Sequence, residues 1–589
     1  MRDGVELATD VYLPSGPGPF PSVLQRTPYD RTAASNADVT QGDPRPASRA
    51  EQGAQYAAEG LAFVIQDCRG THASEGAFVK YLSDGEDGAD TCAWLVAQAW
   101  SDGRICTVGL SYDAHTQGAL GCYDPPGLVA QVLDCGGLWN AWKSGGRAFG
   151  VFEMKQVMWA FRQAIGSPES AADPKLKSAL EAEDIEASMR RLPWRRGESP
   201  LRHHPKYEEY LIDQWEHEVF DGFWQKPPIW MEGNHQRYSK AACVHLSGWY
   251  DPYVLSVTRN YQGLKTAGKG PQYLILGAFT HGHRSRPFAG DVDFGHDAPL
   301  DSWAGDWPSY RLRMFDGVLR GQSSGEPSVR YFLMGGGSGE RTRQGRLLHG
   351  GSWRSAADWP PPEARPMDLY LHPGGSLGLL RSQTPGECSW RHDPADPVPT
   401  RGGNVASLEP LAMAGGYDQS TTDRNDVLIF LTDTLEAPLD VVGSITVHLT
   451  VSTDAPDTDF TAKLIDVYPP SLDFPDGFAL NLSDGIVRLR FAEDPTRARS
   501  ASPNEQRQVQ IVLPDIANRF VAGHRLRLDI ASSNFPKYEF ARGTGPTLGP
   551  FGAPVALNML HFSEAGTNVL SFHVLPEHAE FRKPPPKAP

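Results

Sequence analysis

The feature that most constrains the fold is a regular alternation of short apolar runs with helical segments over the first 135 residues. Strands are predicted at residues 23–25, 61–65, 104–109 and 128–133, and helices at residues 50–60 and 86–98. The run at 61–65 is apolar throughout, which is typical of a strand buried on both faces. The alternation therefore predicts an α/β fold, a parallel sheet covered by helices.

A helical block rich in tryptophan, residues 138–240, interrupts this alternation. Its tryptophans are Trp139, Trp142, Trp159, Trp194, Trp215, Trp224 and Trp230. Apolar side chains at positions 151, 154, 158 and 161 predict one face of a helix near its start. Strand-like runs resume at residues 243–246 and 273–276. We therefore expect one α/β domain, residues 1–137 and 241–328, with residues 138–240 inserted into it.

The pattern changes again at residue 329, where helical segments almost vanish. Apolar residues then alternate with polar ones at residues 445–451, 460–464, 509–513, 526–530 and 570–574. Turn residues separate these runs, as is typical of an antiparallel β-sandwich. Residues 329–589 are therefore expected to form an all-β domain.

The composition argues against several classes of partner. Lys and Arg number 55 and Asp and Glu 71, for a formal net charge of −16 at pH 7, whereas a protein that binds nucleic acid or an anionic membrane carries a basic face. No window of about 18 apolar residues is present, so no transmembrane helix is expected. The seven cysteines are odd in number and lack metal-ligand spacing. We expect them to be reduced thiols in a cytoplasmic protein.

The sharpest local motif is a Gly-x-Ser triplet, Gly109 to Ser111, that follows an apolar strand and precedes a helix. In a nucleophile elbow the serine occupies such a turn, and a small residue two positions earlier avoids a clash. The second glycine common in this motif is replaced by Asp113. The alternative interpretation is a serine that forms a turn or caps the helix.

A general base and an orienting acid follow Ser111 in the order that the strand–turn–helix motif requires. Asp251 comes after the strand at 243–246, and His281 after the strand at 273–276. Asp251 could instead form a turn before Pro252, and His281 could be a surface histidine. Too few ligands lie nearby for a zinc site with His283, so no metal is expected. His115, four residues after Ser111, lacks an acid partner and is interpreted as a packing or pocket residue.

Short motifs distributed along almost the whole chain carry a family resemblance. They lie at residues 1–5, 26–30, 66–70, 73–76, 98–103, 109–112, 248–251, 293–295, 459–464, 523–525 and 532–538. In these motifs the sequence resembles the CocE/NonD family, the cocaine esterase-like branch of the X-Pro dipeptidyl-peptidase (S15) hydrolases. This resemblance implies an α/β-hydrolase domain with an inserted helical cap, followed by a C-terminal jelly-roll β-sandwich.

The resemblance also implies roles for individual residues. The catalytic triad falls on Ser111, Asp251 and His281. The oxyanion hole falls on the Tyr29 hydroxyl and the backbone N–H of Tyr112. Trp159 and Tyr253 are the implied substrate-pocket residues, and plain core packing is the alternative for Trp159. Asp113 departs from the family pattern, and we interpret it first as stabilising the helix start and second as tuning the substrate.

The expected activity is hydrolysis of a carboxylic ester with an apolar or aromatic acyl group, without a cofactor. The alternatives within the superfamily are an X-Pro dipeptidyl-peptidase and an acylase for β-lactams or α-amino-acid esters. Both alternatives need a carboxylate cluster. The candidate acids for it, for which a solvated helix face is the alternative interpretation, are Glu208, Glu209, Asp213 and Glu216. A non-catalytic binding protein is the alternative from another class. A homodimer is the one macromolecular assembly expected.

Overall fold

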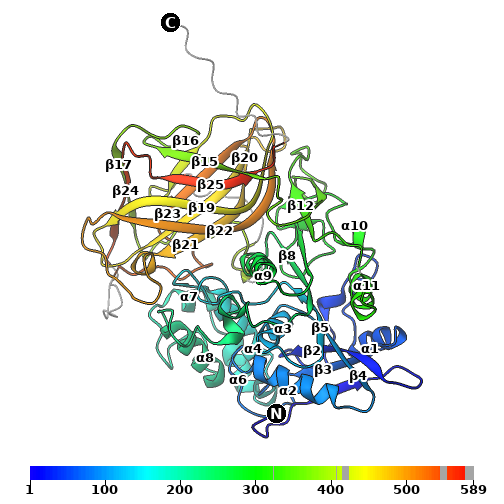
Figure 1. Ribbon diagram of the computed structural model, residues 1–589. Coiled ribbons are helices and arrows are strands. Elements are labelled where there is room, and N and C mark those ends of the chain that lie inside the picture. The colour runs from blue at the N-terminus through cyan, green and yellow to red at the C-terminus, as the bar shows by residue number, and fades with distance from the viewer. Residues whose placement is uncertain (323, 406–407, 414–422, 544–553, 577–589) are drawn as a thin grey trace.

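The computed structural model describes residues 1–322, 324–405, 408–413, 423–543 and 554–576 (Figure 1). An α/β domain, a helical cap and a β-sandwich lie against one another, and the sandwich occupies the upper left of Figure 1. The expected fold class, α/β with an all-β C-terminal domain, is confirmed. No helix in the described part of the chain is both long and apolar enough to cross a membrane.

The α/β domain is built on one mixed sheet. The strands follow in the spatial order β1 (Thr9–Tyr12), β3 (Ala62–Asp67), β2 (Phe20–Thr27), β4 (Ser101–Leu110), β5 (Leu128–Asp134), β8 (Ala242–Gly248), β9 (Gln272–Gly277), β12 (Val329–Met334) and β14 (Gly351–Ala356). The two edge pairings, β1 with β3 and β12 with β14, are antiparallel, and the other pairings are parallel. The carboxyl ends of β4, β8 and β9 therefore meet at one edge, where Ser111, Asp251 and His281 follow them.

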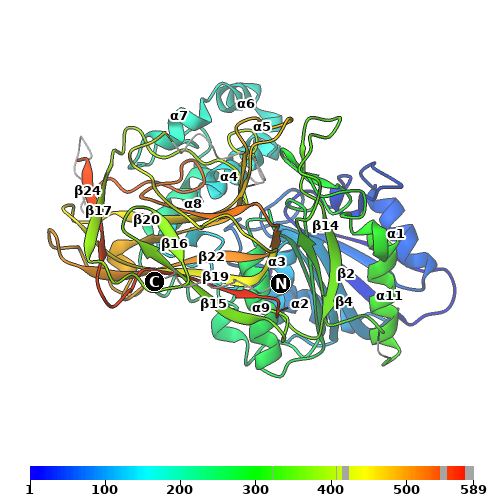
Figure 2. The ribbon, with the colours of Figure 1, turned by 90° about the horizontal axis from the view of Figure 1, so that it is seen from above.

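Helices cover both faces of this sheet, and its central strands are accordingly buried along most of their length, as in β3, β5 and β8. The helices are α1 (Arg49–Ala58), α2 (Asp84–Val96), α3 (Tyr112–Gly121), α9 (Val254–Thr266), α10 (Asp301–Ala304) and α11 (Trp307–Leu319). Tyr56 of α1 and Trp307 of α11 pack with Phe63 on one face. Leu95 of α2 packs with Val64 on the other face. Figure 2 shows α1 and α11 together on one side of the sheet, away from the cap.

Strand pairing carries this sheet beyond residue 328. β12 pairs in parallel with β9, and a single residue pair, Met334 with Asn518, joins it to the sandwich. Three short strands, β10 (Phe288–Ala289), β11 (Val292–Asp293) and β13 (Leu347–Leu348), form a small separate sheet. The division into residues 1–137 with 241–328, residues 138–240 and residues 329–589 remains a prediction about independently folding units.

The helical cap lies against both the α/β domain and the sandwich, to one side of them in Figure 2. Its elements are β6 (Arg147–Ala148), β7 (Val151–Phe152), α4 (Lys155–Ile165), α5 (Pro168–Ala172), α6 (Pro174–Glu181), α7 (Ile185–Arg190) and α8 (Pro205–Glu216). The predicted helix face at 151–161 was partly wrong, because Val151 belongs to a two-stranded hairpin and α4 begins at Lys155. Gly150 at φ 93° makes the hairpin turn.

Antiparallel strands form the C-terminal sandwich, with a shared apolar core. Its strands are β15 (Arg365–His372), β16 (Ser376–Gly378), β17 (Gly386–His392), β18 (Leu428–Leu431), β19 (Leu439–Thr453), β20 (Asp459–Tyr468), β21 (Phe478–Arg488), β22 (Arg507–Phe520), β23 (Arg525–Ala531), β24 (Ala556–Phe562) and β25 (Val569–Val574). One layer pairs β19 with β22, β24 and β25, and the other pairs β23 with β18 and β20. Val447 of the first layer and Leu528 of the second lie in the same core.

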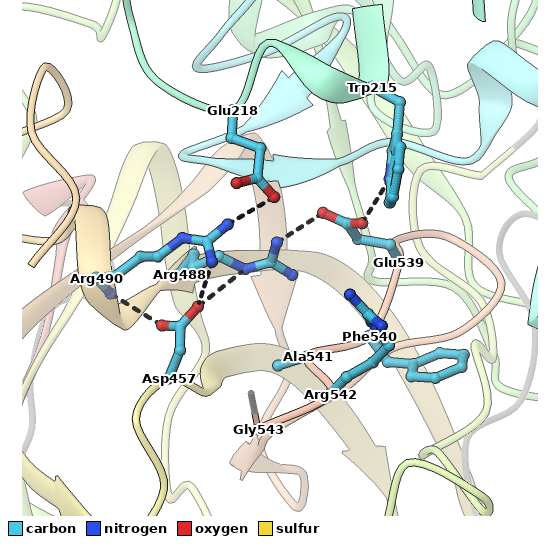
Figure 3. A pocket seen from close by; sticks show the side chains of 10 residues that line it. All are labelled: Trp215, Glu218, Asp457, Arg488, Arg490, Glu539, Phe540, Ala541, Arg542 and Gly543. Atoms are coloured by element: carbon cyan, nitrogen blue, oxygen red, sulfur yellow. Dashed lines mark hydrogen bonds and ion pairs between the residues drawn. The ribbon is translucent and has the colours of Figure 1, made fainter. Parts of the chain in front are cut away.

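Buried ion pairs join the sandwich to the cap (Figure 3). The Glu539 carboxylate accepts a hydrogen bond from Arg488 at 2.8 Å and another from the indole of Trp215 in α8 at 3.0 Å. Nearby, Arg490 pairs with Glu218 at 2.7 Å and with Asp457 at 3.3 Å. The cap is therefore held to the sandwich by charged groups as well as by apolar packing.

Candidate active site

Ser111 lies in a strained turn between β4 and α3. Its φ is 65° and its ψ is −118°, a backbone conformation that residues other than glycine rarely adopt. A Cβ atom on Gly109 would lie 2.3 Å from the Cβ atom of Asp113, so glycine is required there. The sequence prediction of a strand, a tight turn and a helix at this point is confirmed, and the turn presents the Ser111 hydroxyl at the sheet edge.

The structure brings the three predicted triad residues together. The Nε2 atom of His281 lies 2.7 Å from the Ser111 Oγ atom. Its Nδ1 atom lies 3.2 Å from Oδ1 of Asp251. The residues come from three different loops and are separated by up to 170 positions in the sequence. Their hydrogen bonds follow the order nucleophile, base, acid that nucleophilic catalysis requires.

Asp251 is fully buried and its carboxylate is surrounded by donors. Ser247 Oγ donates to Oδ2 at 3.0 Å, and the Tyr253 backbone N–H donates to Oδ1 at 2.9 Å. Burial by itself raises the pKa of Asp251, but the charge of His281 and hydrogen bonds from His281, Cys135 and the Tyr253 N–H hold the pKa below its ordinary value. Asp251 is therefore ionised and can stabilise a protonated imidazole.

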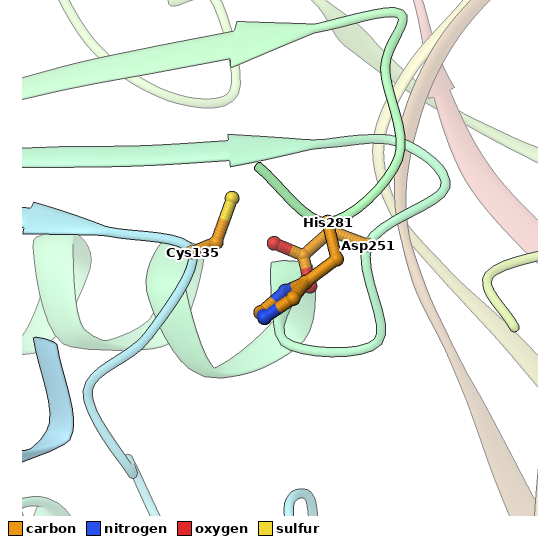
Figure 4. A group of neighbouring side chains, drawn as sticks. All are labelled: Cys135, Asp251 and His281. Carbon is orange, nitrogen blue, oxygen red and sulfur yellow. The ribbon is translucent and has the colours of Figure 1, made fainter. Parts of the chain in front are cut away.

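Cys135, one of the seven cysteines predicted to be reduced thiols, lies beside Asp251 and His281 (Figure 4). Its sulfur and one ligand atom each of Asp251 and His281 lie within 4.8 Å of one another. Burial and the charges of Asp251 and Asp134 raise the pKa of the thiol, so it stays protonated and is a poor metal ligand. His283 is engaged elsewhere, since its Nδ1 atom lies 2.8 Å from Thr280 Oγ1.

Two donors face the region next to the Ser111 hydroxyl. Tyr112 is the first residue of α3, so its backbone N–H has no acceptor within the helix and lies at the positive end of the helix dipole. Burial raises the pKa of the Tyr29 phenol, while hydrogen bonds with Trp159 and Ser111 act in the opposite direction. The phenol thus stays protonated near Ser111 and is available as a donor.

Aromatic rings line the space around these donors. The indole Nε1 of Trp159 in α4 donates to the Tyr29 hydroxyl at 3.0 Å, and its ring is stacked near Tyr112 with centroids 5.8 Å apart. The Tyr253 ring lies 5.6 Å from that of His281. Of the two predicted pocket residues, Tyr253 therefore lies beside the triad histidine, and Trp159 lies beside the predicted oxyanion-hole residues Tyr29 and Tyr112.

His115 does not compete with His281 as a base. Its Nδ1 atom accepts a hydrogen bond from the Gly137 backbone N–H at 2.9 Å. The imidazole is buried between the rings of Tyr81 and Tyr253, with centroids 5.2 and 4.8 Å away. Burial and the charge of Lys80 hold the pKa of His115 well below its ordinary value. It is a neutral packing residue next to the site.

Comparison with known proteins supports the resemblance seen in the sequence. A model of the X-Pro dipeptidyl-peptidase (S15) family matches residues 3–283, and one of the X-Pro dipeptidyl-peptidase C-terminal non-catalytic domain matches residues 322–571. The cocaine esterase of Rhodococcus sp. (strain MB1 Bresler) is 33% identical over 92% of this chain and 91% of its own. The chain belongs to the CocE/NonD family of S15 hydrolases. It is a serine hydrolase of the carboxylesterase type.

Solved structures show that the family fold extends over the whole chain. An aminopeptidase from a Thaumarchaeota archaeon covers 98% of this chain and 95% of its own, with a TM-score of 0.77 and 24% identity. An α-amino acid ester hydrolase gives the same coverage, with a TM-score of 0.73 and 23% identity. A CocE/NonD family hydrolase from Staphylococcus aureus covers 98% and 92%, with a TM-score of 0.67 and 17% identity.

Asp113, the departure from the family elbow, is buried rather than exposed at the helix start. It is 4% exposed, and its Oδ2 atom accepts a hydrogen bond from Gln25 Nε2 at 2.7 Å. Burial raises the pKa of Asp113 to about 7, although Gln25 and the charge of Arg49 act against this rise. The negative charge that the helix-dipole interpretation needs is therefore only partly present at neutral pH.

The acids of the cap do not form a cluster at the site. Glu209 and Glu216 both pair with Arg196 at the surface, at 2.9 and 3.2 Å. Glu208 accepts hydrogen bonds from Gly197 and Ser199 within the cap, and Asp213 is exposed beside His217. The sequence analysis left open whether these acids form a substrate-binding cluster or a solvated helix face. Their contacts favour a solvated face with structural hydrogen bonds.

Two buried lysines near the triad were missed by the sequence analysis. Lys80 lies 3.6 Å above the ring of Trp159, and Lys155 lies 4.9 Å from the ring of Tyr253. The available signal was a lone lysine within the apolar run of residues 78–82. Such a residue also suits a snorkelling surface position, so its burial could not be read from the sequence.

Proposed function

We propose that this CocE/NonD family member hydrolyses carboxylic esters through a Ser111–His281–Asp251 triad and a covalent acyl-enzyme. The observation that carries the proposal is the imidazole of His281, which lies 2.7 Å from the Ser111 hydroxyl while its other nitrogen faces the buried Asp251 carboxylate. A nucleophile, its base and the group that orients the base are thereby in one hydrogen-bonded line.

In the first half of the reaction, His281 Nε2 takes the Ser111 proton and Oγ attacks the ester carbonyl carbon. The carbonyl oxygen becomes an oxyanion that accepts hydrogen bonds from the Tyr29 phenol and the Tyr112 N–H, where a helix N-terminus favours negative charge. His281 then protonates the leaving alcohol. Water, deprotonated by His281, releases the acid from Ser111 in the second half. Asp251 holds the tautomer and stabilises the imidazolium in both halves.

An ester with an apolar or aromatic acyl chain is the proposed substrate class. Trp159, Tyr112 and Tyr253 supply flat apolar walls beside the nucleophile, and aromatic rings of this kind bind hydrocarbon chains. Cocaine esterase, the 33% identical relative, has an ester substrate in its name. Cleavage of an X-Pro dipeptide or an α-amino acid ester is the second candidate. It needs a carboxylate cluster at the site, whereas Glu209 and Glu216 of the cap pair with Arg196 at the surface.

Replacement of the nucleophile tests the proposal. Ser111→Ala is expected to lower kcat for p-nitrophenyl esters by about 10⁴-fold to 10⁶-fold, because the covalent step is lost. The matched control is Ser178→Ala, an exposed serine of α6, which should keep the wild-type rate. Labelling with a fluorophosphonate should modify Ser111 in the wild-type protein. A wild-type rate in Ser111→Ala would show that Ser111 is not the nucleophile. Neither hydrolysis nor labelling by the folded wild-type protein would favour a non-catalytic binding protein.

Three expectations from the sequence remain predictions. They are a cytoplasmic location, a homodimer, and an activity that needs neither metal nor cofactor. Activity after exhaustive dialysis against a chelator tests the last of them. The first two need cell fractionation and a measurement of mass in solution.

A further inference from the structure

Lys80 is a buried cation that lacks a carboxylate partner. Lys80 is 4% exposed, and no Asp or Glu in the described part of the chain forms an ion pair with it. Its Nζ atom donates a hydrogen bond to Gln156 Oε1 at 2.8 Å. Its buried neighbours differ, since Lys155 pairs with Glu153 and Lys537 pairs with Asp484 at 2.6 Å.

The unpaired ammonium group lies close to the reacting atoms. It sits 3.6 Å above the ring of Trp159, whose indole nitrogen is 3.0 Å from the Tyr29 hydroxyl. Ser111 lowers the pKa of the Tyr29 phenol, so the two hydroxyl groups lie close together. One indole ring therefore contacts both the Lys80 ammonium group and the Tyr29 phenol of the proposed oxyanion hole.

The electrostatics of this position favour an anionic ligand. An ammonium group has three N–H donors, of which Gln156 accepts one. Burying a charge without a counter-ion costs free energy, and cation–π contacts with Trp159, Tyr81 and Tyr210 offset only part of that cost. Burial and the nearby charge of Lys155 accordingly lower the pKa of Lys80. A carboxylate placed beside Lys80 would favour its protonated form and complete an ion pair.

We propose that Lys80 binds a carboxylate at the far end of the acyl chain, so that the preferred substrates are monoesters of aliphatic dicarboxylic acids. The inference rests on the proposed esterase function and narrows it. The aromatic rings contact the hydrocarbon part of the chain, and Lys80 selects its terminal charge. The reaction itself is unchanged: water adds to the ester carbonyl, the alcohol leaves, and the second carboxylate takes no part.

The charge of Lys80 acts against a substrate with a free amine. An acyl chain that ends in an ammonium group would place this group next to Lys80. Like charges in a site of low dielectric constant repel strongly. This chain is therefore expected to select the opposite charge from an enzyme that acts on amino-acid esters or on peptides with a free N-terminus.

Three p-nitrophenyl esters of equal chain length test the inference on the wild-type protein: the hemiadipate, the hexanoate and the 6-aminohexanoate. We expect kcat/KM for the hemiadipate to exceed that for the hexanoate by about tenfold, the value of one added charge-assisted hydrogen bond. The 6-aminohexanoate should be the poorest of the three. A hemiadipate-to-hexanoate ratio below about threefold, or a preference for the amine, overturns the inference whatever the variants do.

Substitution of the lysine ties the preference to its charge. Lys80→Met should reduce the hemiadipate-to-hexanoate ratio to about one, while Lys80→Arg should keep most of it. The matched control is Lys175→Met, an exposed lysine of α6, which should leave the ratio as in the wild type. Because both rates scale with the amount of folded protein, a general loss of folded protein leaves the hemiadipate-to-hexanoate ratio unchanged. An unchanged ratio in folded Lys80→Met overturns the inference.

Failure of this inference is distinguishable from failure of the proposed function. Ser111→Ala should abolish the hydrolysis of all three esters alike. If the wild type hydrolyses the hexanoate well through Ser111 and ignores the carboxylate, the esterase proposal stands and the role of Lys80 is wrong. If Ser111→Ala retains activity on all three esters, the proposed function is wrong.

Discussion

Asp113 illustrates how the surroundings of a single residue change its chemistry. Its carboxyl group follows the nucleophile by two positions, is buried behind the elbow, and has one oxygen with no hydrogen-bond partner among the described residues. The sequence shows an acid at the start of a helix, which is ordinarily an exposed and stabilising arrangement. Burial makes the same group a carboxyl whose ionisation opposes folding near neutral pH.

We predict that Asp113→Asn stabilises the protein more at pH 8 than at pH 5. The carboxyl pKa is raised from an ordinary 3.8 to about 7 in the folded protein, so the folded state binds one more proton than the unfolded state between these values. Stability is therefore lost as the pH rises from about 4 to about 7, by an amount on the order of a few kcal/mol. Urea denaturation of both proteins at pH 5 and pH 8 measures the difference. An equal effect of the substitution at both pH values would contradict it.

The elbow shows which properties of an element can be read from its own residues. Gly109, Ser111 and the apolar run before them predict a strand, a turn and a helix, and each forms where expected. The start of the cap was predicted less well. Its period-3 and period-4 spacing reads as helix from Val151, yet residues 147–152 pair as a hairpin. A short apolar segment fits both structures, and contacts from outside the segment decide between them.

Gly109→Ala is predicted to disrupt the elbow. The added Cβ atom would lie 2.3 Å from the Asp113 Cβ atom and 2.9 Å from its backbone, so strand and helix must move apart. We expect a loss of about 1–3 kcal/mol in the free energy of unfolding and at least a tenfold loss of kcat/KM as Ser111 shifts from His281. Gly222→Ala is the control, because no atom lies within 4 Å of the corresponding Cβ position. Wild-type activity in Gly109→Ala would disprove the geometric requirement.

At the scale of the whole molecule, the cap and the sandwich are joined by buried charges. Glu539 accepts hydrogen bonds from the sandwich residue Arg488, the cap indole of Trp215 and the Phe152 backbone N–H, at 2.8 to 3.0 Å. Removing one partner of a buried ion pair leaves the other charge uncompensated, which costs more than the pair contributes. The position of α4, and with it of Trp159 over the site, thus depends on the sandwich.

Glu539→Gln is predicted to destabilise the protein by about 3 kcal/mol at pH 7. Burial by itself raises the pKa of Glu539, but the charges of Arg488 and Arg147 lower it to about 2 from an ordinary 4.5. A carboxyl with a lowered pKa stabilises the fold above its unfolded pKa and loses this contribution as the pH falls from about 4.5 to 2. The difference in urea midpoint between wild type and variant should therefore shrink at pH 3.

The control for this prediction is Glu181→Gln, which breaks an exposed pair with Lys177 in α6. It should change the stability by less than about 0.5 kcal/mol. A Glu539→Gln variant as stable as this control at pH 7 would show that the ionic junction contributes nothing to the fold.

The amino-acid sequence by itself determined the succession of α/β sheet, inserted helices and β-sandwich, because apolar periodicity is a local property of each segment. It also placed Ser111, Asp251 and His281 after three predicted strands of one parallel sheet, whose carboxyl ends share an edge. Only the tertiary structure decided which side chains from distant segments meet. Lys80 reaches Trp159 and Gln156, Asp113 is enclosed beside Gln25, and β12 extends the first sheet past residue 328. Burial and charge pairing depend on neighbours brought by the whole fold, which no local pattern specifies.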